Sequence, residues 1–185
     1  GLGGQVWQRM GLSVTNLAAG EIFQALQSGA LDAAEFVGPY NDLALGFHQV
    51  RKHYYTSSFI EPGLATELVV DKAKYEELPA NLQRIIRDVC QAEYDQVASD
   101  FYANDPRALR TLVEEHDVIV HPEFPEDVLQ AGADAARDIM NELLEHQDPL
   151  TKRTAESFVD ALRLLRTRTE GTDMGYLRAR EQFFD

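Results

Sequence analysis

Two glutamates stand where a candidate strand runs into a turn. Glu35 lies near the end of the apolar stretch LDAAEFV, just before Gly38-Pro39, and Glu61 lies in FIEPG, where a Pro-Gly pair follows the acid directly. Carboxylates are seldom buried unless they are paired, hydrogen-bonded or bound to a cation. Two acids in matching positions therefore predict a cleft lined by carboxylates, which can hold a hard cation through oxygen or work as an acid/base pair.

Each glutamate also has a structural interpretation. Glu35 can cap a nearby backbone amide or pair with a lysine, and Glu61 taken alone is equally compatible with such a role. The repetition of the pattern favours a ligand site, because ligands collect at the carboxyl ends of strands in open α/β sheets. Phe36 and Tyr40 flank the Glu35 corner, and these are the two aromatic residues that we expect at a ligand.

Other reactive side chains lack the spacing that chemistry requires. The five histidines show no metal-binding motif, and no serine stands in a nucleophile elbow. The GLGG turn at the start lacks the pattern of a phosphate-binding loop, although the free amides of a helix beginning there favour an anion. Cys90 is the single cysteine and lies at helical spacing with Ile86, Val89 and Val97, so we expect a buried, unreactive thiol.

The elements that position the two glutamates alternate between strand and helix. Helices are expected at residues 3–10, 20–28 and 41–52, with Gly29 in the left-handed position that ends the second of them. Strands are expected from the short apolar runs at residues 14–18, 31–37, 54–60 and 65–70. We interpret residues 1–72 as an α/β ligand-binding lobe that is incomplete.

Residues 73–185 are dominated by helical patterns. Apolar residues recur at three- and four-residue steps from Leu82 to Phe101, which predicts one long helix. Asp105-Pro106 and Asp148-Pro149 each place a capping residue before a proline, so we expect a new helix to begin at both. A brief strand is expected at residues 118–120, and an apolar stripe continues along residues 154–168.

Charge and hydropathy exclude two classes of partner. The chain has 31 acidic and 17 basic residues, for a net charge of −14, whereas nucleic-acid binding needs clustered Lys and Arg. The basic residues are scattered in small groups, such as Arg51-Lys52, which we interpret as solvated helix faces. No apolar run approaches the roughly 18 residues of a membrane-spanning helix. We therefore expect neither a nucleic-acid partner nor a membrane span.

Several segments together resemble one family. GLGGQVWQRMG, GEIFQALQSGALDAAEFVGPYNDLALGFH, IEPG and ELVVDKAKYEELP are similar to the DctP-type extracytoplasmic solute-binding proteins of TRAP transporters, in the branch that binds 2-oxo acids and other monocarboxylates. The resemblance implies an α/β fold: a second lobe like that of periplasmic binding proteins, with a mixed sheet, followed by long C-terminal helices. It also implies capture of a small organic acid and its delivery to the membrane permease of the transporter.

The resemblance implies roles for particular residues. The side chains of Glu35 and Glu61 and the backbone carbonyl of Phe36 would coordinate a cation, Na⁺ or Ca²⁺, that also touches the substrate carboxylate. The substrate-binding set would be Glu35, Phe36, Tyr40, Asn41 and Glu61. The family usually has Trp at the position of Phe36, so this chain keeps the carbonyl and a ring but lacks the indole donor. A cation is physically reasonable here, because two acids would otherwise repel an anionic substrate.

The resemblance also implies that further residues precede Gly1 and that the C-terminal helix can take part in a dimer. The arginine that binds the substrate carboxylate in this family, and a glutamine that serves the cation, normally lie just before GLGG, and Arg9 inside the first helix is no substitute. We therefore expect that residues precede Gly1, among them an export signal for the periplasm, and that the 185 residues alone bind ligand poorly and expose apolar surface. Relatives dimerise by exchanging a long C-terminal helix, and residues 154–168 have a stripe suited to this or to packing within one subunit.

Two other functions remain open at this point. A hydrolase could use Glu35 and Glu61 as acid and base, which requires one glutamate with a raised pKa and a catalytic separation between the two carboxyl groups. The acidic helical half alone would also suit a cytosolic interaction protein. The binding protein, which is not an enzyme, is the interpretation that the Glu35 region favours.

Overall fold

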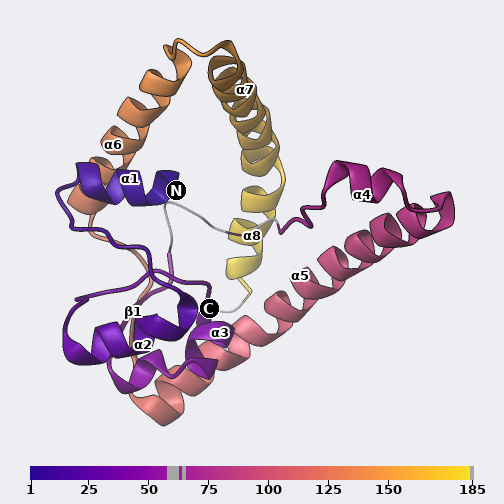
Figure 1. Ribbon diagram of the computed structural model, residues 1–185. Helices are drawn as coiled ribbons and strands as arrows, with labels where there is room; N and C mark the ends of the chain where they lie inside the picture. Colours follow the sequence, from indigo (N-terminus) through magenta and orange to yellow (C-terminus); the bar gives the residue numbers. More distant parts are fainter. Residues whose placement is uncertain (58–62, 64–65, 184–185) are drawn as a thin grey trace. The chain divides into compact units, whose positions relative to one another are not determined.

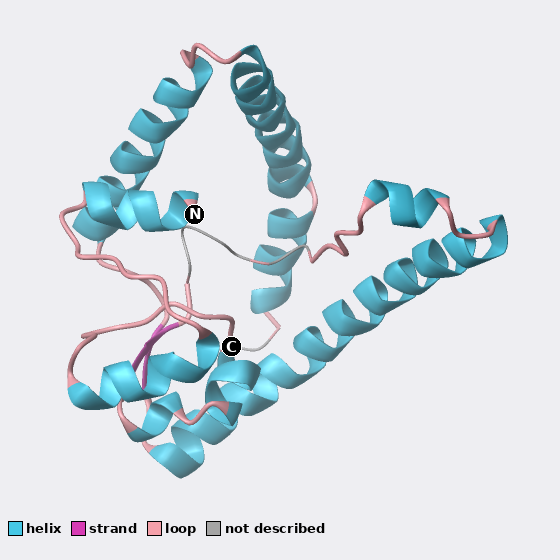
Figure 2. Ribbon diagram, viewed as in Figure 1, coloured by secondary structure: helices cyan, strands magenta, loops and turns pink. Residues whose placement is uncertain are grey.

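The computed structural model describes residues 1–57, 63 and 66–183, and helices make up most of it (Figures 1 and 2). The elements follow in the order α1 (Leu2–Arg9), α2 (Ala19–Ser28), α3 (Pro39–Ala44), the 3₁₀-helix η1 (Phe47–Gln49), β1 (His53–Tyr55), α4 (Lys72–Glu76), α5 (Ala80–His116), β2 (Ile119–His121), α6 (Glu126–Leu144), α7 (Pro149–Gly171) and α8 (Asp173–Glu181).

Contacts group the chain into two compact units, one of Gly1–Val14 with Asp127–Asp185 and the other of Thr15–Glu126. The lobe boundary expected between residues 72 and 73 stays a prediction. Among the described residues, no helix combines the length and the apolar character needed to cross a membrane.

The sheet of the unit formed by residues 15–126 joins two distant segments. β1 and β2 pair in parallel, with Tyr54 opposite Val120. The amide of Ile119 donates to the carbonyl of Lys52 at 2.7 Å, and the amide of Thr56 donates to the carbonyl of His121 at 3.1 Å, so the ladder continues beyond the strands. The strands expected at residues 54–60 and 118–120 are thereby confirmed in part, each within the described residues.

The other expected strands are wrong where the structure describes them. Residues 14–18, 31–37 and 66–70 have no regular secondary structure. Their apolar, β-branched composition suits a strand, but a strand also requires a partner for its backbone groups. Among the described residues only β1 and β2 supply this partner to each other. The sheet is accordingly smaller than the one expected from the sequence.

α5 is one continuous helix, and the expected break at Asp105-Pro106 is wrong. Pro106 lies inside it. Its C-terminal half packs against α3 and η1 and buries Ala108 and Leu112, whereas its N-terminal half is largely exposed. Cys90 lies on that exposed half, so the expectation of a buried thiol is also wrong.

The unit of residues 1–14 and 127–185 contains α1, α6, α7 and α8. Its buried residues include Val6, Ala135, Ile139 and Ala155. Asp148 caps α7 as expected, since its carboxylate accepts from the amide of Thr151 at 2.8 Å.

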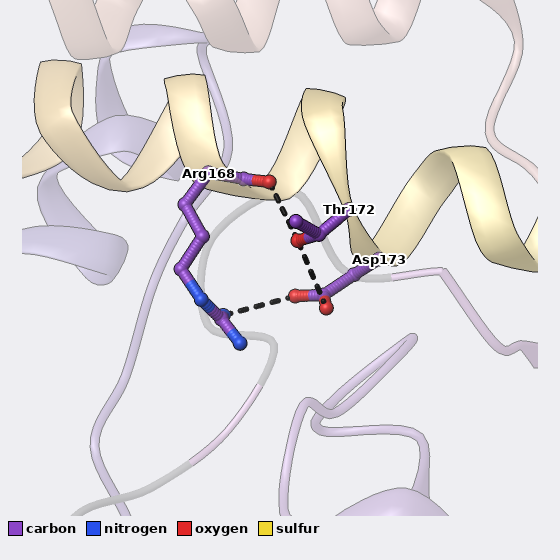
Figure 3. A network of polar contacts seen from close by, with 3 residues as sticks. All are labelled: Arg168, Thr172 and Asp173. Carbon is purple, nitrogen blue, oxygen red and sulfur yellow. Dashed lines mark hydrogen bonds and ion pairs between the residues drawn. The ribbon is translucent and has the colours of Figure 1, made fainter.

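Polar contacts link the end of α7 to the start of α8 (Figure 3). The Thr172 hydroxyl donates to the carbonyl of Arg168 at 2.7 Å, and the Arg168 guanidinium donates to Asp173 at 3.1 Å. The interruption expected near Gly171 and the short terminal helix are thereby confirmed.

Candidate ligand-binding site

The segment that carries the Glu35 corner is a loop between α2 and α3. α2 ends at Gly29, whose φ of 75° lies in the left-handed region that glycine adopts without strain. The amide of Leu31 then returns to the carbonyl of Ala25 at 3.1 Å, which directs the chain away from the helix. The loop continues to Gly38 and leads into α3, so Glu35 and Phe36 lie between two helices.

Four of the five expected site residues lie in or directly after this loop. Glu35 is exposed and stands on the loop, so the expectation of an acid at the end of a buried strand is wrong. Phe36 is half-buried and packs edge-on against Phe47, with ring centroids 5.9 Å apart. Tyr40 is 47% exposed, and its ring lies edge-on to Phe101 with centroids 6.3 Å apart.

Asn41 carries an incomplete hydrogen-bond arrangement. The residue is half-buried, and its side-chain oxygen Oδ1 is buried without a hydrogen-bond partner among the described residues. Buried polar atoms normally have a partner, so this oxygen is available to accept from a ligand. The fifth expected residue, Glu61, lies outside the described residues, and its approach to Glu35 stays a prediction.

Two aspartates hold the C-terminal end of the loop. Oδ1 of Asp105, from α5, accepts from the amide of Tyr40 at 3.0 Å. A Cβ at Gly38 would lie 3.3 Å from the same oxygen, so glycine permits this close approach. The carboxylate of Asp42 accepts from the Tyr54 hydroxyl on β1 at 2.7 Å, and the nearby backbone of Val37 and Gly38 lowers its pKa. The loop end is therefore tied to both α5 and the sheet.

This packing shifts the pKa values of two side chains, Asp42 and Tyr54. Burial raises the pKa of Asp42, the hydrogen bond from Tyr54 lowers it, and the nearby charge of Asp105 raises it further. Burial also raises the pKa of Tyr54, and the charge of Asp42 adds to the increase. Both effects disfavour additional negative charge at this position.

Arg51 holds the N-terminal end of the same loop. Its Nη2 donates to the carbonyl of Leu31 at 2.8 Å, and its Nε donates to the carbonyl of Asp32 at 3.0 Å. Its Nη1 donates to the carbonyl of Val50 at 2.8 Å. Lys52 donates to the carbonyl of His116 at 2.6 Å, at the end of α5. The interpretation of Arg51-Lys52 as a solvated helix face is therefore wrong.

The sequence pattern does not indicate the roles of Asp105 and Arg51. Asp105 had the right signal, an acid before a proline, but its carboxylate caps α3 and not a helix that begins at its own position. Arg51 had no local signal, because its acceptors lie about twenty residues earlier in the chain. Both residues act on backbone groups that only the folded chain brings within reach.

Within the described ranges, no group of three or more His, Cys, Asp or Glu side chains is arranged to hold a metal ion. An open hollow of about 590 Å³ lies elsewhere, between residues 66–70 and the α4–α5 region, and its lining includes Lys72, Arg87 and Cys90. This lining does not include Glu35, Phe36, Tyr40 or Asn41. The expected site therefore depends on the loop geometry and not on this hollow.

The sequence matches the DctP family, bacterial extracellular solute-binding protein family 7, over residues 1–147. The chain belongs to this family. A monocarboxylate 2-oxoacid-binding periplasmic protein of Nostoc sp. is 34% identical over 142 residues, which are 77% of this chain and 38% of the relative. The resemblance that the sequence motifs indicate is thereby confirmed.

Solved structures of DctP relatives match the fold. A TRAP periplasmic solute-binding protein from Colwellia psychrerythraea, with bound calcium and pyruvate, is 30% identical and has a TM-score of 0.90 over 97% of this chain and 54% of its own. A second, from Pseudoalteromonas atlantica with bound sodium and pyruvate, is 32% identical and has a TM-score of 0.85 over 96% of this chain and 54% of its own. The DctP chain thus spans about half the length of these structures.

These matches decide between the functional classes considered for the sequence. The fold class expected, a lobe of a periplasmic binding protein followed by long helices, is confirmed by the two solved structures. The DctP family consists of extracellular solute-binding proteins. This membership supports a binding protein that is not an enzyme, and it speaks against both the carboxylate-pair hydrolase and the cytosolic interaction protein.

Proposed function

We propose that this chain forms the ligand-binding part of a TRAP-transporter solute-binding protein that captures a small monocarboxylate, a 2-oxo acid such as pyruvate, together with Ca²⁺ or Na⁺. The observation that carries the proposal is the Glu35-Phe36 loop, held at both ends, in a chain about one-third identical to relatives named for pyruvate or 2-oxo acids.

The proposed chemistry follows from charge. A carboxylate substrate near Glu35 and Glu61 is repelled unless a cation lies between the negative groups. The side chains of Glu35 and Glu61 and the carbonyl of Phe36 are the oxygen donors that we assign to the cation. These are hard ligands of the type that Ca²⁺ accepts.

Two further residues complete the proposed site. The buried amide oxygen of Asn41 is an acceptor without a partner among the described residues, which suits a cation, its bound water or a donor group of the substrate. The half-exposed ring of Tyr40, fixed against Phe101, supplies a wall for the apolar part of the substrate. Phe36 packs on Phe47 and thereby limits where its own carbonyl can lie.

The proposed place of action is the periplasm, where the protein would deliver its ligand to the membrane permease of a TRAP transporter. The family is extracellular, and relatives are described as periplasmic TRAP proteins. The export signal and the permease are parts of this proposal.

We also propose that two copies associate through α7. Phe158, Leu162 and Leu165 follow one another at four- and three-residue steps, and each is at least half exposed. An exposed stripe of this kind suits a second helix. Light scattering should give twice the mass of the protein, and a monomer at micromolar concentration would contradict the association.

Calorimetry on the whole protein tests the binding function. Pyruvate should bind in the presence of Ca²⁺ or Na⁺ and lose affinity when the cation is removed. Glu35→Gln should weaken pyruvate binding by at least about 10-fold. Residues that only orient a metal ligand already change the affinity by about 10- to 100-fold when they are mutated, and Glu35 is assigned as a ligand itself. Asp32→Asn is the matched control, because it removes one charge from the same loop without removing an assigned ligand.

The proposal fails if pyruvate and other 2-oxo acids do not bind, or if Glu35→Gln binds as well as Asp32→Asn does. Turnover of a glycoside that Glu35→Gln abolishes would instead support the hydrolase.

A further inference from the structure

The Arg51 side chain connects three backbone carbonyls. Two of them, from Leu31 and Asp32, belong to the loop that carries Glu35, and the third, from Val50, belongs to the segment that leads into β1. The bonds to Leu31 and Asp32 use different nitrogens of the planar guanidinium, at 2.8 and 3.0 Å. A planar fork with five fixed donors suits such an arrangement, whereas a lysine ammonium is a single point of attachment.

The loop needs such an attachment because it has no regular secondary structure. Residues 31–37 form neither helix nor strand, so their backbone groups have no ladder to join. Arg51 satisfies two carbonyls at one end, and it is half-buried against the loop. A charged donor to a carbonyl forms a stronger bond than a neutral donor does, so this attachment restrains the loop more than an ordinary turn contact would.

The segment left between the two attachments is short. Arg51 holds the carbonyls of Leu31 and Asp32, and Asp105 holds the amide of Tyr40. Seven residues, 33–39, lie between these two attachments, and they include Glu35 and Phe36. Metal ligands have to lie within about 0.2 Å of their required distances. Restraint at both ends is a direct way to place a carboxylate and a carbonyl that precisely on a loop.

We propose that Arg51 is a positioning residue for the cation-binding corner: it acts through the backbone of Leu31 and Asp32 and does not touch the ligand. The inference deepens the proposed function and rests on it. Arg51 would determine how tightly Glu35 and Phe36 hold the cation, and through the cation how tightly the carboxylate binds. Its neighbour Lys52 has no such role, because its ammonium group bonds the carbonyl of His116 at the end of α5.

The test compares Arg51→Ala, Arg51→Lys and the matched control Lys52→Ala in the whole protein. Calorimetry measures the Kd for Ca²⁺ and the Kd for pyruvate at saturating Ca²⁺, at a temperature where circular dichroism shows each variant folded. Arg51→Ala should weaken Ca²⁺ binding by about 10- to 100-fold, the range found for residues that orient metal ligands. Arg51→Lys should recover part of the loss, and Lys52→Ala should stay within about twofold of wild type, because it leaves both ends of the loop attached.

Hydrogen exchange supplies a readout that does not depend on the ligand. Arg51→Ala should speed amide exchange in residues 31–37 without speeding it along the C-terminal half of α5, whereas Lys52→Ala should act near His116. A merely structural Arg51 would lower the melting temperature and leave the Kd of the folded protein unchanged.

Each result decides a different point. An unchanged Kd for Ca²⁺ in Arg51→Ala overturns the inference, and so does an equal loss in Lys52→Ala. If Arg51→Ala does not fold, Arg51→Lys decides: wild-type affinity together with wild-type loop exchange overturns the positioning role of the planar fork. Wild-type protein that binds neither Ca²⁺ nor pyruvate overturns the proposed function itself, and the role of Arg51 in binding with it.

Discussion

The two halves of α5 carry similar apolar residues at helical spacing, yet they differ in burial. In the C-terminal half, Ala108 and Leu112 are 5% and 2% exposed, where the helix packs against α3 and η1. In the N-terminal half, Leu82, Ile85 and Val89 are 41%, 53% and 50% exposed. The helix itself is continuous through both halves, so the difference does not come from local backbone structure.

The difference shows what an apolar stripe determines. It determines which face of a helix is suited to burial, but not which polypeptide covers that face. The covered half of α5 also supplies Asp105 to the loop that leads from Glu35 into α3, so packing and site geometry coincide there. The three predictions below test the contrast between the halves.

The largest expected effect is at Leu112. Leu112→Ala removes a side chain that is 2% exposed and leaves a cavity in the half of α5 that packs against α3 and η1, so it should lower the free energy of unfolding by about 2–5 kcal/mol. Urea denaturation followed by circular dichroism measures the change. A loss below about 1 kcal/mol would mean that this half is not packed as described.

A smaller effect is expected on how the stability of the fold depends on pH through Asp42, which lies near Asp105 of the packed half of α5. Because burial raises the pKa of Asp42 in the folded state, the folded protein binds this proton more tightly than the unfolded chain does. Its stabilising contribution is therefore complete below the unfolded pKa of about 3.9 and is lost as the pH rises through the raised value. The stability of wild type relative to Asp42→Asn should fall as the pH increases from acid toward neutral.

Urea denaturation of both proteins across that pH range measures the Asp42 effect, and taking the difference removes the titration of groups that the two proteins share. A difference that rises with pH would show that the pKa of Asp42 is lowered and that the site is not desolvated.

The smallest effect is expected at Leu82, in the exposed half of the same helix. Leu82→Ala repeats the substitution made at Leu112, but the side chain is already 41% exposed, so the cost should stay below about 1 kcal/mol in the 185-residue chain. A cost equal to that of Leu112→Ala would show that this half is buried in the protein measured and would remove the contrast.

Most helices were predictable from the sequence, and only two short strands of the expected sheet were. The helix expected at residues 41–52 is wrong, because Gly46 in the left-handed region separates α3 from the 3₁₀-helix η1. Gly29 and Asp148 mark helix ends through local chemistry, and the structure confirms both. Asp105-Pro106 carries the same local signal as Asp148-Pro149, but its carboxylate bonds a different helix. The apolar run at residues 31–37 looks like a strand, yet a strand depends on a distant partner that local composition does not specify.

The grouping of four candidate site residues in or directly after one loop was predictable, and the contacts that support this loop were not. Glu35, Phe36, Tyr40 and Asn41 lie close together in the sequence, so their common location follows from the loop that contains them. The attachment by Arg51 depends on carbonyl groups about twenty residues away, which no spacing rule indicates.

The parallel pairing of β1 with β2 has a consequence for how the chain reaches its fold. About sixty residues separate the two strands, so their ladder closes a long loop and should form late, after the local helices. Arg51 lies two residues before β1, and it should bind the Glu35 loop at the same late stage. During synthesis, at about 5–20 residues per second, the ribosome makes the Glu35 loop several seconds before it makes β2. The strand β1, which follows Arg51, has no partner until β2 has emerged.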